Sequence, residues 1–275
     1  MRYRPKTQEE IQRENMETLR QMRPLDDDLM RMIFRDNLPL AQLVLRIITG
    51  IDDLELVSEK TQHDLKRLVG ARSICLDVFG RDSEGRLYDM EIQRDDSGAD
   101  PHRARYHSAA IDIEFLDKAS DFASLPDAYV IFITERDIFG GGKALYRIDR
   151  MNRDMDTPFS DGEHIIYVNG AYYRAGDTSD IAKLMHDFRC SDYNDMNFEL
   201  MAQSVRYYKE ETKGVVSVSR LMEARIEAER KYTILGLAEK MIESREMTLD
   251  KIANLTGLTL EEVKELAEEL KVSVT

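Results

Sequence analysis

The chain has 275 residues, of which 42% are hydrophobic and 33% are charged, and its formal net charge is −14 at pH 7. The hydrophobic fraction is large enough for a sizeable core in one large domain or two small ones. The negative charge excludes a protein that coats DNA non-specifically through a basic surface. A local basic patch or a bound metal ion would still permit contact with nucleic acid.

The cysteines, the histidines and the N-terminus exclude several further classes of protein. Cys75 and Cys190 give neither a disulfide framework nor zinc-ligand spacing, and the five histidines show no H-x₃-H or H-E-x₂-H pattern. The first ten residues lack the apolar segment of a secretory signal, and no apolar run reaches the ~18 residues of a membrane span. We therefore expect a cytoplasmic protein with reduced thiols and no membrane partner.

The first predicted elements are helices. Residues 7–22 are polar and helix-prone and begin with Thr7 and Glu10, which have the spacing of a capping box. Residues 38–49 are strongly apolar and form a core helix that ends at Gly50. Residues 54–61 then alternate enough to predict a strand.

A further short helix is predicted between the helices at residues 7–22 and 38–49. It starts at three aspartates, residues 26–28, and carries apolar residues up to Phe34. Asp28 has two interpretations. Its side chain projects toward a carboxylate site as a further metal ligand, or it is one of three ordinary carboxylates facing the helix dipole.

The chain is organised around a predicted β-hairpin at residues 74–93. Residues 74–79 are rich in β-branched, aromatic and apolar side chains, and residues 87–93 alternate apolar and polar residues. Residues 82–85 between them are typical of a tight turn, because Gly85 supplies the positive φ that the reversal needs.

This hairpin brings two carboxylates together. Folding about Ser83 and Glu84 places Asp77 opposite Met90 or Glu91, and a bulged turn that shifts the pairing by one residue sets Asp77 directly across from Glu91. Opposed residues have Cβ atoms about 4.5–5.5 Å apart. Two carboxylates at that distance repel each other unless one is protonated or a cation lies between them. A hard divalent ion such as Mg²⁺ is the usual cation.

Asp77 followed after a hairpin by Glu91, Ile92 and Gln93 resembles the core of the PD-(D/E)xK nucleases. The resemblance is to the branch called the Rpn family, the recombination-promoting or transposase-like nucleases. Three other stretches fit it: residues 25–34, 102–112 and 129–134. The resemblance implies an α/β fold, with a mixed central β-sheet flanked by helices and an α-helical C-terminal extension.

The resemblance also implies roles for individual residues. Asp77 and Glu91 would hold Mg²⁺ or Mn²⁺, with the Ile92 carbonyl as a third ligand and Asp28 as a further one. Gln93 stands where the superfamily has lysine, and glutamine is a known variant in this branch. Glutamine can orient the attacking water but supplies no positive charge.

Residues 102–117 form a predicted long helix with three basic or aromatic residues near its start: Arg103, Arg105 and Tyr106. In the nuclease interpretation they approach the scissile phosphate or its neighbours. Alternatively, the two arginines neutralise three surface aspartates: Asp95, Asp96 and Asp100. We expect His107 to be a packed helix residue rather than a ligand or a base.

Residues 128–134 are a continuous apolar run, which predicts a central strand buried on both faces. Residues 145–150 and 164–168 are predicted to be further strands. Residues 177–180 are predicted to cap a helix that ends at Phe188. The glycine loop at residues 137–142 is a flexible connection rather than a phosphate cradle, because no G-K-[ST] follows it.

The C-terminal part is predicted to be helical. We expect a nuclease-like domain at residues 1–190, a helical extension at 191–245 and a helix-turn-helix-like hairpin at 246–275. The second helix of that hairpin is acidic and would repel phosphate, so packing or homo-oligomer formation is favoured over DNA binding.

The sequence favours a divalent-metal-dependent DNA endonuclease, linked through the resemblance to recombination, transposition or defence against foreign DNA. The alternative is a catalytically weak or inactive member that acts as an interaction or assembly module, which the acidic charge and Gln93 favour. A carboxylate-pair hydrolase acting on glycosides is supported only by the carboxylates themselves.

Overall fold

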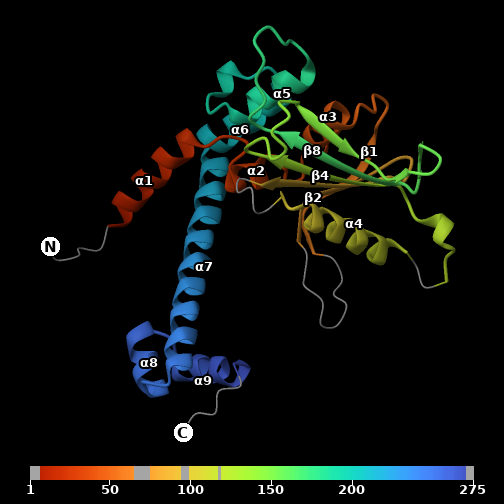
Figure 1. Cartoon of the computed structure of the whole chain (residues 1–275). Coiled ribbons are helices and arrows are strands. Elements are labelled where there is room, and N and C mark those ends of the chain that lie inside the picture. The colour runs from red at the N-terminus through yellow and green to blue at the C-terminus, as the bar shows by residue number, and fades with distance from the viewer. Residues whose placement is uncertain (1–6, 65–74, 94–98, 117–118, 271–275) are drawn as a thin grey trace. The chain divides into compact units, whose positions relative to one another are not determined.

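The computed structural model describes residues 7–64, 75–93, 99–116 and 119–270 (Figure 1). The chain divides into two compact units, Met1–Val218 and Ser219–Thr275. The predicted boundaries lie instead at 190 and 245, and they stay predictions.

The first unit is an α/β structure built on a mixed sheet of six strands, in the order β1-β2-β3-β4-β8-β5. Strands β1, β2 and β3 are antiparallel neighbours, β3, β4 and β8 run parallel, and β5 is antiparallel to β8. The strand bounds are β1 Leu56–Asp64, β2 Cys75–Asp82, β3 Leu87–Gln93, β4 Ala128–Thr134, β5 Leu145–Ile148 and β8 Glu163–Asn169. The predicted strands are confirmed, and β4 occupies the central position that its unbroken apolar run predicted.

The hairpin of β2 and β3 closes through a bulged turn. The Gly85 N–H donates to the Asp82 carbonyl at 3.1 Å, Gly85 has φ 86°, and the Asp82 N–H donates to the Arg86 carbonyl at 3.1 Å. This is a type I turn followed by a left-handed residue, in which glycine carries no Cβ penalty. The turn sets the register that pairs Val78 with Met90.

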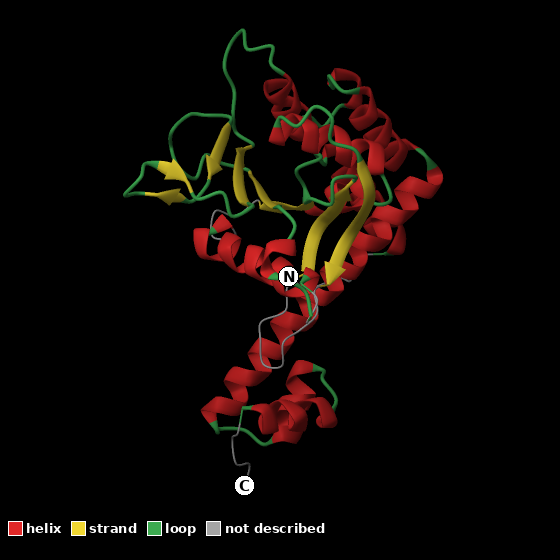
Figure 2. Ribbon diagram, turned by 90° about the vertical axis from the view of Figure 1, so that its right-hand side faces the viewer, coloured by secondary structure: helices red, strands yellow, loops and turns green. Residues whose placement is uncertain are grey.

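Helices cover both faces of the sheet (Figures 1 and 2). Helix α4 packs on one face against β4, and α2 and α3 lie on the other, with α5 and α6 packed against them. The helix bounds are α1 Gln8–Gln21, α2 Asp27–Phe34, α3 Leu38–Thr49, α4 Pro101–Phe115, α5 Asp180–Arg189 and α6 Glu199–Glu210. The predicted capping box of Thr7 and Glu10 and the left-handed C-cap at Gly50 are confirmed.

Short elements complete this unit: the 3-10 turns η2 Phe122–Ser124 and η3 Tyr193–Asp195, and a two-stranded hairpin of β6 Met151–Asn152 and β7 Thr157–Pro158. The sequence analysis missed β6 and β7, because two-residue strands carry too few side chains for an alternation to be recognised.

A buried core joins α4 to the sheet. Its fully buried side chains come from both layers: Phe79, Leu87, Ala99, Ala104, Ile111, Ala128, Val130, Phe132 and Tyr167. Leu87 faces α4, so strand alternation directs Asp89 and Glu91 to the same face. Covered by α4 on that face and lying between β2 and β4, β3 is buried along almost its whole length.

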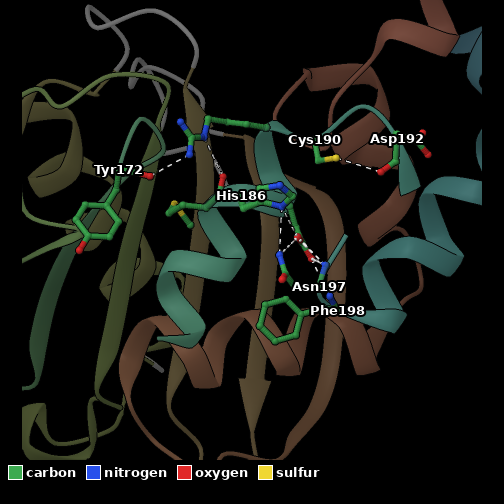
Figure 3. A network of polar contacts seen from close by, with 9 residues as sticks. Tyr172, His186, Cys190, Asp192, Asn197 and Phe198 are labelled. Atoms are coloured by element: carbon green, nitrogen blue, oxygen red, sulfur yellow. Dashed lines mark hydrogen bonds and ion pairs between the residues drawn. The ribbon is translucent and has the colours of Figure 1, made fainter. Parts of the chain in front are cut away.

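One buried carboxylate ties α5 to α6 (Figure 3). Asp187 accepts hydrogen bonds from the backbone N–H groups of Asn197 and Phe198, each at 2.8 Å, and from the Asn197 side chain at 2.7 Å. Phe198 is the N-cap of α6. Asp187 therefore satisfies donors at a helix start that would otherwise lack partners.

A buried lysine also links α6 to the end of α1 and to the segment after α5. Lys209 on α6 donates from Nζ to the backbone carbonyls of Arg20, Met22 and Ser191 at 2.9, 2.6 and 2.6 Å. Burial lowers the pKa of Lys209 to about 8. Segments nearly 190 residues apart in sequence thus meet at one ammonium group.

The second unit is helical. It contains most of α7 (Thr212–Ser244) together with α8 (Leu249–Thr256) and α9 (Leu260–Glu269). These helices share a small core that includes Ile242, Ile252 and Val263. Thr259 and Glu262 form a capping box at the start of α9. Among the described residues no helix is long and apolar enough to cross a membrane.

Candidate functional site

Asp77 and Glu91 meet on neighbouring strands. Val78 pairs with Met90, so the next position along the hairpin sets Asp77 across from Glu91. The Asp77 N–H donates to Glu91 Oε1 at 2.9 Å, and the Ile92 N–H lies 3.5 Å from Asp77 Oδ2. The bulged turn therefore produces the juxtaposition that the sequence analysis expected.

A third carboxylate, Asp89, lies on the same face two residues before Glu91. Asp89 is 0% exposed, Glu91 is 1% exposed, and the Asp77 side chain is 13% exposed. A ligand atom from each of Asp89, Glu91 and His107 lies within 4.8 Å of the others. We call Asp77, Asp89 and Glu91 the carboxylate cluster.

Burial and mutual repulsion favour the protonated form of all three groups. Burial raises the pKa of Glu91 to about 8, and the negative charges of Asp89 and Asp77 contribute to that rise. Burial, followed by the charge of Asp77, raises the pKa of Asp89 well above its ordinary value. Burial likewise raises the pKa of Asp77, although Arg31 opposes the rise. Such a cluster is stabilised by protons or by a cation.

Two residues of α4 reach this cluster. Arg103 donates from Nη2 to Glu91 Oε2 at 3.1 Å and from Nε to His107 Nε2 at 3.3 Å. His107, 3% exposed, places Nδ1 2.8 Å from Asp89 Oδ2. Burial lowers the pKa of His107, and the nearby Arg103 charge adds to this. A neutral imidazole thus lies between a carboxylate and a guanidinium.

Helix α2 contributes a second cation. Arg31 Nη2 lies 3.9 Å from Asp77 Oδ1, and the charge of Asp27 adds to the raised pKa of Asp77. Asp28 is fully buried in the first turn of this helix. Its role as a metal ligand stays a prediction.

Two further predicted residues of β3, Ile92 and Gln93, lie beside the carboxylate cluster. Gln93 Nε2 is 3.5 Å from Glu91 Oε2, so its amide lies beside the cluster. Ile92 presents its backbone N–H to Asp77. The proposed use of the Ile92 carbonyl as a ligand stays a prediction.

Arg105 and Tyr106 occupy the exposed face of α4, whereas Arg103 faces the sheet. Asp100 is the N-cap of this helix and accepts from the His102 N–H at 2.7 Å. Asp95 and Asp96, the other suggested partners of the arginines, lie outside the described residues, as does the side chain of Cys75. Of the three residues predicted to bind phosphate, Arg103 is the one that the structure brings to the cluster.

Asp89 and Arg31 were not predicted as site residues from the sequence, and His107 was predicted to be a packing residue. Two signals were available. Asp89 and Glu91 have the i, i+2 spacing of one strand face, and Arg103 and His107 have the i, i+4 spacing of one helix face. Neither spacing shows that this helix face packs against this strand face.

A cavity of about 370 Å³ lies elsewhere, beside the amino ends of β4 and β8, where Tyr129 and His164 stack at 4.5 Å. Several of its charged side chains are paired with one another: Arg150 contacts Asp161 and Glu163, and His164 lies 2.9 Å from Asp149. We place the candidate site at the carboxylate cluster, because the cavity lacks a comparable group of buried carboxylates.

The carboxylate cluster and the neighbouring His107 thus offer several oxygen ligands and one imidazole nitrogen to a cation. Arg31 and Arg103 lie at the edge of the cluster. Comparison with protein-family models, curated proteins and solved structures finds no match for this chain.

Proposed function

We propose that this protein is a divalent-metal-dependent DNA endonuclease with a PD-(D/E)xK-like core of the Rpn type. The observation that carries the proposal is the meeting of Asp77 and Glu91 on adjacent antiparallel strands. The proposal draws further support from Gln93 beside Glu91 and from Arg103 at the edge of the cluster. It includes the role implied by the resemblance, cutting DNA in recombination, transposition or defence.

In this mechanism Asp77 and Glu91 would hold the ion, with the Ile92 carbonyl and Asp28 as candidate further ligands. When bound, Mg²⁺ or Mn²⁺ would lower the pKa of an attacking water and stabilise charge on the phosphate. Gln93 orients the water, since its amide can donate and accept hydrogen bonds. Arg103 offers a forked set of donors to the phosphate oxygens.

Local positive charge must offset the net charge of −14. Arg31 and Arg103 already contact the cluster, and Arg105 on the exposed face of α4 would meet the neighbouring DNA backbone in this proposal. Tyr106, also exposed, extends this surface. Such a limited basic surface is consistent with weak, salt-sensitive DNA binding.

Cleavage of supercoiled plasmid tests the proposal. The full chain with Mg²⁺ or Mn²⁺ should nick or linearise the plasmid, and EDTA should stop the reaction. Asp77→Asn and Glu91→Gln should each lower the rate on the order of 100-fold or more, because each removes a charged ligand.

The matched control is Glu84→Gln, which removes an exposed carboxylate from the turn of the same hairpin and should cleave like the unaltered protein. Equal cleavage by the Asp77 and Glu91 variants would show that a contaminant or another site cuts the DNA.

A second function, an interaction or assembly module, is favoured by the charge of α9. This helix carries five glutamates and one lysine: Glu261, Glu262, Glu265, Glu268, Glu269 and Lys264. The C-terminal helices would then mediate homo-oligomer contacts. Sedimentation of the full chain as an oligomer, together with the absence of plasmid cleavage, would favour this alternative.

A further inference from the structure

At the cluster one guanidinium donates to two acceptors, a carboxylate oxygen and an imidazole nitrogen. The guanidinium of Arg103 donates to Glu91 Oε2 and to His107 Nε2. A guanidinium has donors only, so His107 Nε2 must present its lone pair and the ring proton lies on Nδ1. That proton points to Asp89 Oδ2 at 2.8 Å. An ion bound in place of this proton would have both Nδ1 and Asp89 Oδ2 as ligands.

A second observation points to a ligand at the same place. Asp89 is completely buried, and its Oδ1 has no hydrogen-bond partner among the residues that the structure describes. Leaving a buried polar atom without a partner costs about 1–3 kcal/mol, and more when the group is charged. Buried carboxylates in proteins are paired or coordinate metals.

The spacing of the donors suits a small ion. One ligand atom from each of Asp89, Glu91 and His107 falls within 4.8 Å of the other two. First-row ions hold nitrogen and oxygen ligands at about 2.0–2.2 Å, so ligands on opposite sides of the ion are about 4.4 Å apart. Side-chain movements of a few tenths of an ångström would close the site.

We propose that Asp89, Glu91 and His107 form a second divalent-cation site, which binds a first-row transition ion such as Mn²⁺ in preference to Mg²⁺. In the ion-free protein, the His107 ring proton, which lies between Nδ1 and Asp89 Oδ2, occupies the position of that ion. The site rests on the proposed function in that it shares Glu91 with the site at Asp77. Its selectivity follows from the imidazole, because Mg²⁺ keeps oxygen ligands whereas transition ions accept nitrogen.

Binding of the ion at Nδ1 would move the ring proton to Nε2, which could then no longer accept the hydrogen bond from Arg103. The Arg103 side chain is 40% exposed, so it can leave Glu91 and His107 for solvent or for a phosphate oxygen. Ion binding would then both fill the site with a divalent cation and free the Arg103 guanidinium.

Mn²⁺ binding followed by electron paramagnetic resonance tests the site without measuring cleavage. We expect two Mn²⁺ per chain in the unaltered protein. In excess Mg²⁺ one Mn²⁺ should remain, and its pulsed spectrum should show coupling to an imidazole ¹⁴N. His107→Gln should abolish the coupling and the Mg²⁺-resistant ion, whereas Asp77→Asn should retain both.

Two further variants make the test decisive. His102→Gln removes an exposed histidine from the start of the same helix and should leave the coupling unchanged. Asp89→Asn, which keeps the side-chain shape, should weaken Mn²⁺ binding at least about tenfold, because it removes a charged oxygen ligand. It tests the site independently should His107→Gln fail to fold.

The outcomes separate this inference from the proposed function. Mn²⁺ binding without ¹⁴N coupling, or coupling that persists in His107→Gln, would overturn the second site and leave the Asp77 site standing. Coupled Mn²⁺ in a protein that cleaves no DNA would overturn the nuclease and leave the second site standing. A change in cleavage with unchanged Mn²⁺ binding in His107→Gln would show that the Asp89–His107 pair only positions Arg103.

Discussion

In the absence of divalent ions, raising the pH should destabilise the first unit through Glu91. Burial raises the pKa of the Glu91 carboxyl from its ordinary 4.5 to about 8. Between these values the folded protein holds a proton that the unfolded chain has lost, so the free energy of unfolding falls as the pH rises. Each pH unit removes about 1.4 kcal/mol, or about 5 kcal/mol over the interval. That loss is absent below pH 4.5 and complete above pH 8.

The loss is large compared with the roughly 5–15 kcal/mol that stabilises a typical domain. Urea unfolding in EDTA, followed by tyrosine fluorescence between about pH 5 and pH 9, measures it. The chain has no tryptophan, and of its 12 tyrosines only Tyr232 lies beyond residue 218, so the signal reports the first unit.

Glu91→Gln should remove the part of this pH dependence that comes from Glu91, about 5 kcal/mol, since an amide cannot ionise. Glu84→Gln, at an exposed turn position, should keep it. Saturating Mn²⁺ should oppose the loss at high pH, because the ion binds the deprotonated groups of the folded state; an excess of 100 times Kd adds about 2.7 kcal/mol. The reasoning is refuted if the unaltered protein and Glu91→Gln lose the same free energy of unfolding over this pH range.

Three further predictions follow from other contacts. Gln93→Lys should raise the cleavage rate several-fold, because an ammonium beside Glu91 supplies the charge that glutamine lacks; an unchanged or lower rate would show that Gln93 does not take the place of the superfamily lysine. Arg103→Ala should lower kcat about 10–100-fold, whereas Arg105→Ala should mainly raise KM and reduce the salt dependence of binding; equal effects on kcat would contradict the distinct positions of the two arginines on α4. Lys209→Met should destabilise the first unit on the order of 3–5 kcal/mol in urea unfolding, because three backbone carbonyls lose their buried donor, and the exposed control Lys213→Met should stay within about 0.5 kcal/mol of the unaltered protein.

Local chemistry explains why much of the fold could be predicted from the sequence. A turn, a cap or an apolar run acts over a few residues, so its signal is present in a short stretch of chain. Gly85 fixed the bulged turn and with it the register that places Asp77 across from Glu91. The apolar run at residues 128–134 likewise placed β4 inside the sheet, since only a strand covered on both faces tolerates such a run.

The remainder of the candidate site depended on tertiary packing. Asp89 and His107 are 18 residues apart, and their contact exists because α4 lies on the face of β3 that carries Glu91. Arg31 lies 3.9 Å from Asp77 because α2 packs against β1 and β2. The sequence by itself determined the carboxylates of the hairpin and most of the helices and strands, through local backbone preferences and side-chain periodicity. Only the packing of helices on the sheet decided that an imidazole and two arginines surround these carboxylates, because residue spacing within one element does not encode which faces of distant elements meet.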